Sequence, residues 1–167
     1  IRLQVDADPG IDAQSICNEI CFNTITAFGN ATSFYSPIRV TGYSTREFMD
    51  LKISDNTLYG NVYHDVWTTY VLKSEISRNK VRNNLMSGSY AFYLVETIGL
   101  RFESNVIEDN QGTPLMAYGL YAGTDTAYIH ILNNHCIGAS NANPYSHSVA
   151  NNILGRGNRI TRSPLIG

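Results

Sequence analysis

The sequence lacks the features that mark several large classes of protein. No apolar run approaches the roughly 18 residues that span a bilayer as a helix, so no membrane partner is expected. Lys and Arg number 12 against 14 Asp and Glu, which gives a formal net charge of −2. Because phosphate-backbone binding depends on clustered positive charge, no nucleic-acid partner is expected either.

Cysteine is scarce, and the usual catalytic signatures are missing. The 3 cysteines are an odd number without Cys-x-x-Cys spacing, so neither a disulfide framework nor a metal centre is expected. There is no glycine-rich phosphate loop, no Gly-x-Ser-x-Gly elbow and no His-Glu-x-x-His. Only 16% of residues are charged, whereas Asn, Gly, Ser, Thr and Tyr are abundant. This composition favours an all-β extracellular or virion protein that needs no cofactor.

The feature that stands out is a repeated asparagine frame. Gly, Pro and Asn interrupt nearly every long stretch, and apolar residues alternate instead of recurring at helical spacing. An apolar residue, an Asn three positions later, an apolar residue two further on and a second Asn recur at residues 53–61, 76–84 and 102–110. Weaker copies begin at residues 20, 131 and 149. The six frames start 33, 23, 26, 29 and 18 residues apart.

This variable spacing is typical of a solenoid whose strands are constant and whose turns differ in length. An Asn between two short strands can adopt the left-handed conformation at low cost. Its side-chain amide can then bond to equivalent amides in the coils above and below. We therefore expect a ladder of stacked asparagines, with coils about 4.8 Å apart.

The frames resemble the right-handed parallel β-helix of the pectate-lyase-like superfamily, in which an asparagine commonly occupies the tight turn between the second and third strands. The resemblance implies an all-β fold of about six coils over residues 18–160. Residues 1–17 then form a lead-in or cap, and residues 161–167 form an exit tail. Fold alone does not imply function, because this superfamily includes lyases, hydrolases, epimerases, phage tailspikes and adhesins.

One coil can be placed in detail. Residues 90–96 are expected to form its first strand, 100–104 the second and 106–110 the third, with the turn at Asn105. Alternation puts Phe92 and Leu94 inward and leaves Tyr93 outward. The next coil places Tyr121 in the same outward column, and we expect Tyr70 there too. Such a column is typical of sugar stacking; the alternative is that it covers a neighbouring subunit or packs under residues 31–50.

Candidate catalytic groups lie close to this column. Glu96 and Asp125 fall at corresponding places on neighbouring coils and could form the carboxylate pair of a glycosidase. Calcium ligation and simple solvation are the alternatives. His64 and Asp65 place a base beside an acid, a faint likeness to the clusters of β-helix lyases and epimerases. Arg101, with Arg78 and Arg82, could neutralise an acidic sugar; the alternative is a solvated strand edge.

Three functions remain open. The favoured one is a carbohydrate-directed module of an extracellular or phage receptor-binding protein, as a homotrimer or part of a longer chain, that binds or degrades a polysaccharide. The second is a stand-alone polysaccharide lyase, glycoside hydrolase or epimerase. The third is a structural spacer whose tyrosine face is an oligomer interface.

Overall fold

The structure is a computed structural model that describes residues 1–4, 15–16, 18–26, 28, 36–44, 47–140, 145–147 and 154–161. These residues form β-strands and turns, with no helix among them. Accordingly, the described part offers no helix that could cross a membrane. The proposed boundaries of the lead-in and exit tail fall largely on residues outside this set, as does Cys17.

Twenty strands form three sheets, and every pairing between them is parallel. Sheet A contains β1 (Arg2–Gln4), β2 (Ser15–Ile16), β5 (Ile38–Thr41), β6 (Phe48–Met49), β9 (Val66–Leu72), β12 (Ser89–Ile98), β15 (Met116–Ala122) and β18 (Tyr145–His147). Sheet B contains β3 (Glu19–Cys21), β7 (Lys52–Ser54), β10 (Glu75–Ser77), β13 (Arg101–Glu103), β16 (His130–Leu132) and β19 (Leu154–Arg156). Sheet C contains β4 (Thr24–Thr26), β8 (Thr57–Tyr59), β11 (Lys80–Arg82), β14 (Val106–Glu108), β17 (His135–Ile137) and β20 (Arg159–Thr161).

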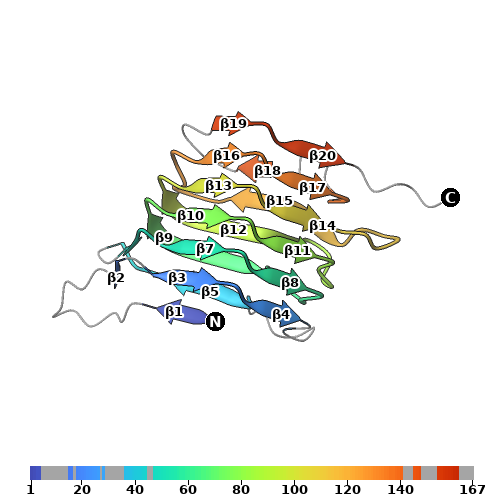
Figure 1. Cartoon of the computed structure of the whole chain (residues 1–167), viewed down its shortest axis with the longest axis horizontal. Helices are drawn as coiled ribbons and strands as arrows, with labels where there is room; N and C mark the ends of the chain where they lie inside the picture. Colours follow the sequence, from blue (N-terminus) through green and yellow to red (C-terminus); the bar gives the residue numbers. More distant parts are fainter. Residues whose placement is uncertain are drawn as a thin grey trace.

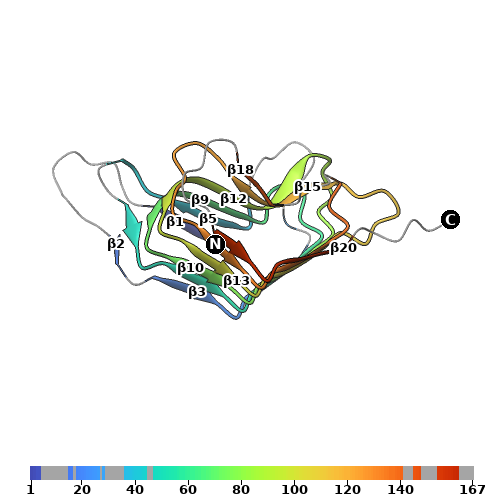
Figure 2. The same cartoon turned by 90° about the horizontal axis from the view of Figure 1, so that it is seen from above.

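The chain visits the sheets in the order A, B, C and then begins again one layer higher (Figure 1). Seen along the stack, sheets B and C meet at a corner and sheet A lies across from them (Figure 2). This arrangement is a parallel β-helix, as the repeated frames predicted. Parallel strands joined through other sheets need no tight hairpins, which explains why the connections can vary so much in length.

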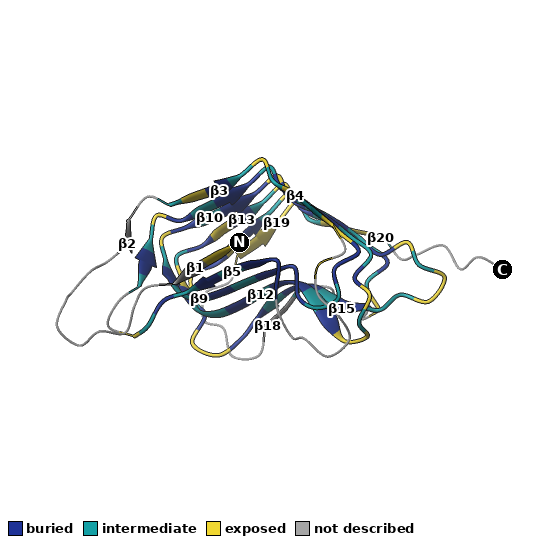
Figure 3. Cartoon of the chain, turned by 90° about the horizontal axis from the view of Figure 1, so that it is seen from below, coloured by how far each residue is buried: buried dark blue, intermediate teal, exposed yellow. Residues whose placement is uncertain are grey.

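The core fills the space between the three sheets. Inward positions carry apolar side chains that stack layer upon layer, such as Ile53, Ile76 and Phe102 in sheet B, all at most 1% exposed. In sheet A, Phe92 pairs with Leu120 on one side and with Val66 on the other, and all three are at most 1% exposed. Buried residues line the inside of the strands, while exposed ones gather at turns and in β19 (Figure 3). The predicted inward and outward alternation is confirmed.

A continuous asparagine ladder follows the corner between sheets B and C. Each Asn side-chain Nδ2 donates to the Oδ1 of the Asn one coil higher, at 2.9–3.0 Å. The rungs are Asn23, Asn56, Asn79, Asn105, Asn134 and Asn158. Each backbone N–H of the lower rung also donates to that same oxygen. The amides therefore satisfy one another inside a corner that excludes water.

Two details of the expected ladder are wrong. The left-handed residue is not the Asn but the residue before it, such as Ser104 with φ of 54°. The Asn keeps ordinary backbone angles because both its N–H and its side chain must point along the stack. The sixth rung is Asn158, whereas it was expected within residues 149–154, of which 149–153 lie outside the described residues. Here the left-handed residue is Gly157, where an added Cβ would lie 2.2 Å from Asn133 Oδ1.

Candidate functional site

A column of cationic and aromatic side chains runs along the outer face of sheet A. The register pairs Tyr93 with Tyr121 on one side and with Trp67 on the other. Trp67 pairs in turn with Arg39, and Arg39 with Arg2. Each coil thus contributes one side chain to the column, and the three aromatic members are half-buried. The long β9, β12 and β15 hold these side chains at the spacing of hydrogen-bonded strands.

Neighbouring rings widen this column into a patch that we call the aromatic surface. Its members are Tyr63, His64, Trp67, Tyr90, Tyr93, Tyr118 and Tyr121. The centroids of Trp67 and Tyr93 lie 5.4 Å apart, and those of Tyr93 and Tyr121 lie 5.7 Å apart. Tyr90 stacks on Tyr121 with an interplanar angle of 12°. Ring-on-ring packing fixes the orientation of these side chains, so the surface is pre-organised.

Two phenols of the aromatic surface, those of Tyr90 and Tyr93, are held in their protonated form. Partial burial, followed by the proximity of other phenols, raises the pKa of Tyr90 and of Tyr93 above the ordinary value of 10.0. A protonated phenol is both a hydrogen-bond donor and an acceptor. The surface therefore combines apolar ring faces with hydroxyls of dual hydrogen-bonding character.

Tyr70 does not belong to this column, which corrects the sequence-based placement. The pairs Val95–Thr69 and Thr97–Val71 put Tyr70 opposite Glu96. The place expected for Tyr70 is taken by Trp67, three residues earlier. Tyr70 and Glu96 both have positive φ, of 53° and 49°, because the chain bends there at the end of sheet A.

Tyr70, Glu96 and Asp125 form a row at this bend, which we call the acidic corner. The backbone N–H of Glu96 donates to Thr124 O, which places Asp125 beside Glu96 on the next coil. Hydrogen bonding to Glu96, with burial and the charges of Glu96 and Asp125, raises the pKa of Tyr70. The backbones of Glu96 and Asp125 thus lie on adjacent coils, and their role as a catalytic carboxylate pair stays a prediction. Strands about 4.8 Å apart suit the spacing of about 5–5.5 Å in retaining glycosidases.

His64 and Asp65 are placed differently from a solvent-facing acid–base pair. His64 is 3% exposed, and its Nδ1 accepts the Tyr90 backbone N–H at 3.0 Å while its ring stacks on Tyr90. Burial lowers its pKa from 6.5 to about 4, so the ring is neutral at pH 7. Asp65 is fully buried, and its Oδ1 accepts the Asn61 amide at 2.6 Å. Both residues thus contribute to packing, and their catalytic role stays a prediction.

Asp65 also faces a second buried amide. Burial raises its pKa to about 7, and the nearby amides of Asn61 and Asn84 act in the opposite direction. Asp65 Oδ2 and Asn84 Oδ1 are each buried without a hydrogen-bond partner. Both are acceptors when the carboxyl is ionised, whereas a protonated Asp65 can donate to Asn84. The arrangement fits a neutral carboxyl that braces the turn before β9.

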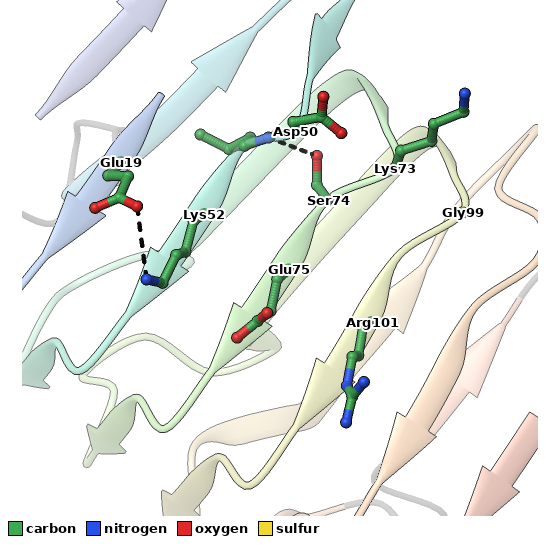
Figure 4. Close-up of a pocket in the computed structure, with 9 residues that line it drawn as sticks. Glu19, Asp50, Lys52, Lys73, Ser74, Glu75, Gly99 and Arg101 are labelled. Atoms are coloured by element: carbon green, nitrogen blue, oxygen red, sulfur yellow. Dashed lines mark hydrogen bonds and ion pairs between the residues drawn. The ribbon is translucent and has the colours of Figure 1, made fainter. Parts of the chain in front are cut away.

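Arg101 lies on sheet B, outside the aromatic surface. It lines a groove of about 480 Å³ together with Glu19, Lys52 and Glu75 (Figure 4). These four side chains occupy one row of alternating charge across β3, β7, β10 and β13. Arg101 pairs with Glu103 at 2.6 Å, and Lys52 with Glu19 at 3.6 Å. Lys52 and Glu19 thus form a cross-strand ion pair, whereas Arg101 pairs with Glu103 of its own strand β13.

Sequence reasoning missed Trp67, Tyr90, Tyr118 and Arg39. The signal for Trp67 in the sequence is the frame spacing, because Trp67 precedes Tyr93 by the same 26 residues by which Ile76 precedes Phe102. Within the described residues, no group of three or more His, Cys, Asp or Glu could hold a metal ion. The suggestion of a calcium site at the acidic corner stays a prediction.

The chain was compared with protein-family models, with curated proteins and with solved structures, and none of the three comparisons found a significant match. Interpretation of the site therefore depends on its own geometry.

Proposed function

We propose that this β-helix is a carbohydrate-directed module whose aromatic surface binds a cell-surface polysaccharide. The observation that supports it most is the column of Trp67, Tyr93 and Tyr121, with one half-exposed ring on each successive coil. Aromatic faces accept the C–H faces of pyranose rings, and phenols bond sugar hydroxyls. A repeating surface suits a repeating polymer, because each coil offers the next sugar a similar contact.

The composition supports an extracellular or virion setting. Only 16% of the residues are charged, and Tyr alone accounts for 11 residues. A tailspike-like receptor-binding protein, as a homotrimer or as one section of a longer chain, is the context that we propose.

Binding should be tested with a panel of neutral and acidic bacterial polysaccharides, measured by biolayer interferometry. Tyr93→Ala should weaken binding about tenfold or more, because stacking on an aromatic ring contributes about 1–2 kcal/mol. Tyr59→Ala is the matched control, since Tyr59 is 48% exposed but lies on sheet C. If no polysaccharide of the panel bound, and if wild-type trimers dissociated in the Tyr93→Ala variant, the result would favour a structural spacer with a tyrosine interface.

A second candidate function is hydrolysis of the bound glycan at the acidic corner. The observation that favours it is the alignment of Glu96 and Asp125 on adjacent coils, three to four residues beyond the aromatic column. New reducing ends should then appear with wild-type protein and disappear in Glu96→Gln or Asp125→Asn. Glu19→Gln, an exposed acid of sheet B, should keep the activity. Glycan binding without new reducing ends would leave the module as a binder only.

A further inference from the structure

Three polar groups beside the aromatic surface are buried and have no hydrogen-bond partner. They are Ser36 Oγ, Arg39 Nε and Trp67 Nε1. The arginine and indole nitrogens can only donate, and a serine hydroxyl can donate as well. Buried donors without acceptors are rare in folded proteins, because each one costs about 1–3 kcal/mol. Three of them in neighbouring residues indicate that an acceptor is missing.

Ser36 and Arg39 line a pocket of about 130 Å³, and Trp67 lies beside it, against Arg39. Its lining combines Arg39, Arg2 and Ser36 with the apolar Ile1 and Phe28. The Arg39 guanidinium carbon lies 4.5 Å from the centroid of the Trp67 ring. Cation–π contact holds the guanidinium at the edge of the aromatic surface. Ser36 is 6% exposed, so its hydroxyl belongs to the interior of the site and is not a surface group.

Arg39 differs from the arginines of sheets B and C in its ion pairing. Of the ion pairs found in the described part of the chain, none involves Arg39. This contrasts with Arg78, Arg82 and Arg101, each of which pairs with a carboxylate of the protein. The column on sheet A therefore has a cationic end, Arg2 and Arg39, followed by aromatic rings.

From this we infer that the pocket is a subsite for an anionic group of the glycan, and that the natural ligand is an acidic polysaccharide whose carboxylate binds Arg39. The inference rests on the proposed function, because it names the substrate class of the same surface. A planar carboxylate matches the guanidinium fork and accepts two hydrogen bonds from it. The adjacent sugar ring then meets Trp67, and the following sugars meet Tyr93 and Tyr121.

Trp67 is the single tryptophan of the chain, so its fluorescence reports directly on the pocket. The intact chain should be titrated with sodium glucuronate, and with glucose, at constant ionic strength. We expect a saturable change of Trp67 emission with glucuronate at about millimolar concentration, the affinity typical of a ligand of this size. Glucose should produce a change at least tenfold weaker. Glucose 6-sulfate and glucose 6-phosphate distinguish a carboxylate site from a general anion site.

Variants separate the pocket from the rest of the surface. Arg39→Gln should abolish the preference for glucuronate over glucose, and Arg39→Lys should restore only part of it, because lysine lacks the fork. Arg156→Gln, an exposed arginine of β19, should behave as wild type. Circular dichroism establishes that each variant is folded, and Ser36→Ala gives a second variant with minimal change of volume.

The outcomes are distinct for the two proposals. Equal responses to glucuronate and glucose, or a glucuronate response that Arg39→Gln and Ser36→Ala both retain, would overturn the anionic subsite. Polysaccharide binding that depends on Tyr93 is independent of that result, and it would still support the proposed function. If the wild-type protein showed neither a response to glucuronate nor binding of any polysaccharide, both the anionic subsite and the proposed function would be overturned.

Discussion

Asn105 donates twice to Asn134 Oδ1, from its backbone N at 2.9 Å and from its side-chain Nδ2 at 3.0 Å. Its own Oδ1 accepts the same two bonds from Asn79, and its Nδ2 also reaches Ile76 O. One side chain thus ties three coils together. The corner that organises the β-helix depends on these amides more than on the short strands beside it.

Asn105→Ala should lower the free energy of unfolding by about 2–4 kcal/mol, because several buried donors and acceptors lose their partners. Asn110→Ala is the matched control: Asn110 is exposed, and it is the backbone N–H of this residue that donates to Asn83 Oδ1, a bond that the substitution keeps. Urea denaturation measures both. Equal losses in the two variants would contradict a structural role for the ladder.

Ser104→Gly should stabilise the protein by up to about 1 kcal/mol, because a φ of 54° strains any residue with a Cβ. Asn105→Gly should destabilise it, since the ladder contacts are lost. Thermal unfolding of the pair decides which residue forms the turn. A destabilised Ser104→Gly with a tolerated Asn105→Gly would show that the assignment is reversed.

Asp65→Asn should change how stability depends on pH. Burial raises the pKa of Asp65 from 3.8 to about 7, so the folded state binds this proton more tightly. Its contribution is complete below about pH 4 and is lost as the pH rises through about 7. His64 acts in the opposite direction: with a pKa lowered from 6.5 to about 4, its contribution is lost as the pH falls through that range.

The two effects oppose each other between about pH 4 and 6.5 in the wild type. Asp65→Asn removes the pH-dependent contribution of the Asp65 carboxyl, and the new side-chain amide can still donate to Asn84. The variant should therefore gain stability from pH 4 to 6.5 and exceed the wild type at pH 8 by on the order of a few kcal/mol. Urea denaturation across this range measures the difference. Parallel curves for the two proteins would show that Asp65 is not a neutral buried acid.

Cys136 should be unreactive in the folded protein. It is 1% exposed, and burial raises its pKa to about 12. In a Cys17→Ser, Cys21→Ser background, Ellman's reagent should modify Cys136 only at the rate of unfolding. Full modification within seconds under native conditions would mean that sheet C opens readily at the coil that contains Cys136.

The sequence was sufficient for the fold because the asparagine frame and the apolar alternation impose the same register. Phe92 and Leu94 could be assigned inward from alternation alone, and the structure confirms both. The identity of the left-handed residue could not be inferred from the sequence. The tight turn needs both a left-handed residue and a side-chain amide, but the repeated frame shows only the Asn that supplies the amide. The placement of Tyr70 was wrong although the frames carry the information: Ile76 and Phe102 pair across 26 residues, and the same offset from Tyr93 leads to Trp67.

The candidate site was predicted only in part for a related reason. Glu96 lies within β12, and its backbone N–H donates to Thr124 O, which brings Asp125 beside it just after β15. The burial of His64 and Asp65 depends on Asn61 and Asn84, which come from turns of two different coils. The contact of Arg39 with Trp67 joins residues 28 positions apart, across a connection whose length has no sequence signature.

The most direct test of the central claim is an NMR map of a bound oligosaccharide, prepared from the polysaccharide that binds best in the panel. The largest chemical-shift changes should fall on the Trp67 indole N–H and on Tyr93 and Tyr121, with Tyr59 on sheet C unaffected. Changes confined to sheet C, or to the charged groove around Arg101 on sheet B, would contradict glycan binding at the aromatic surface.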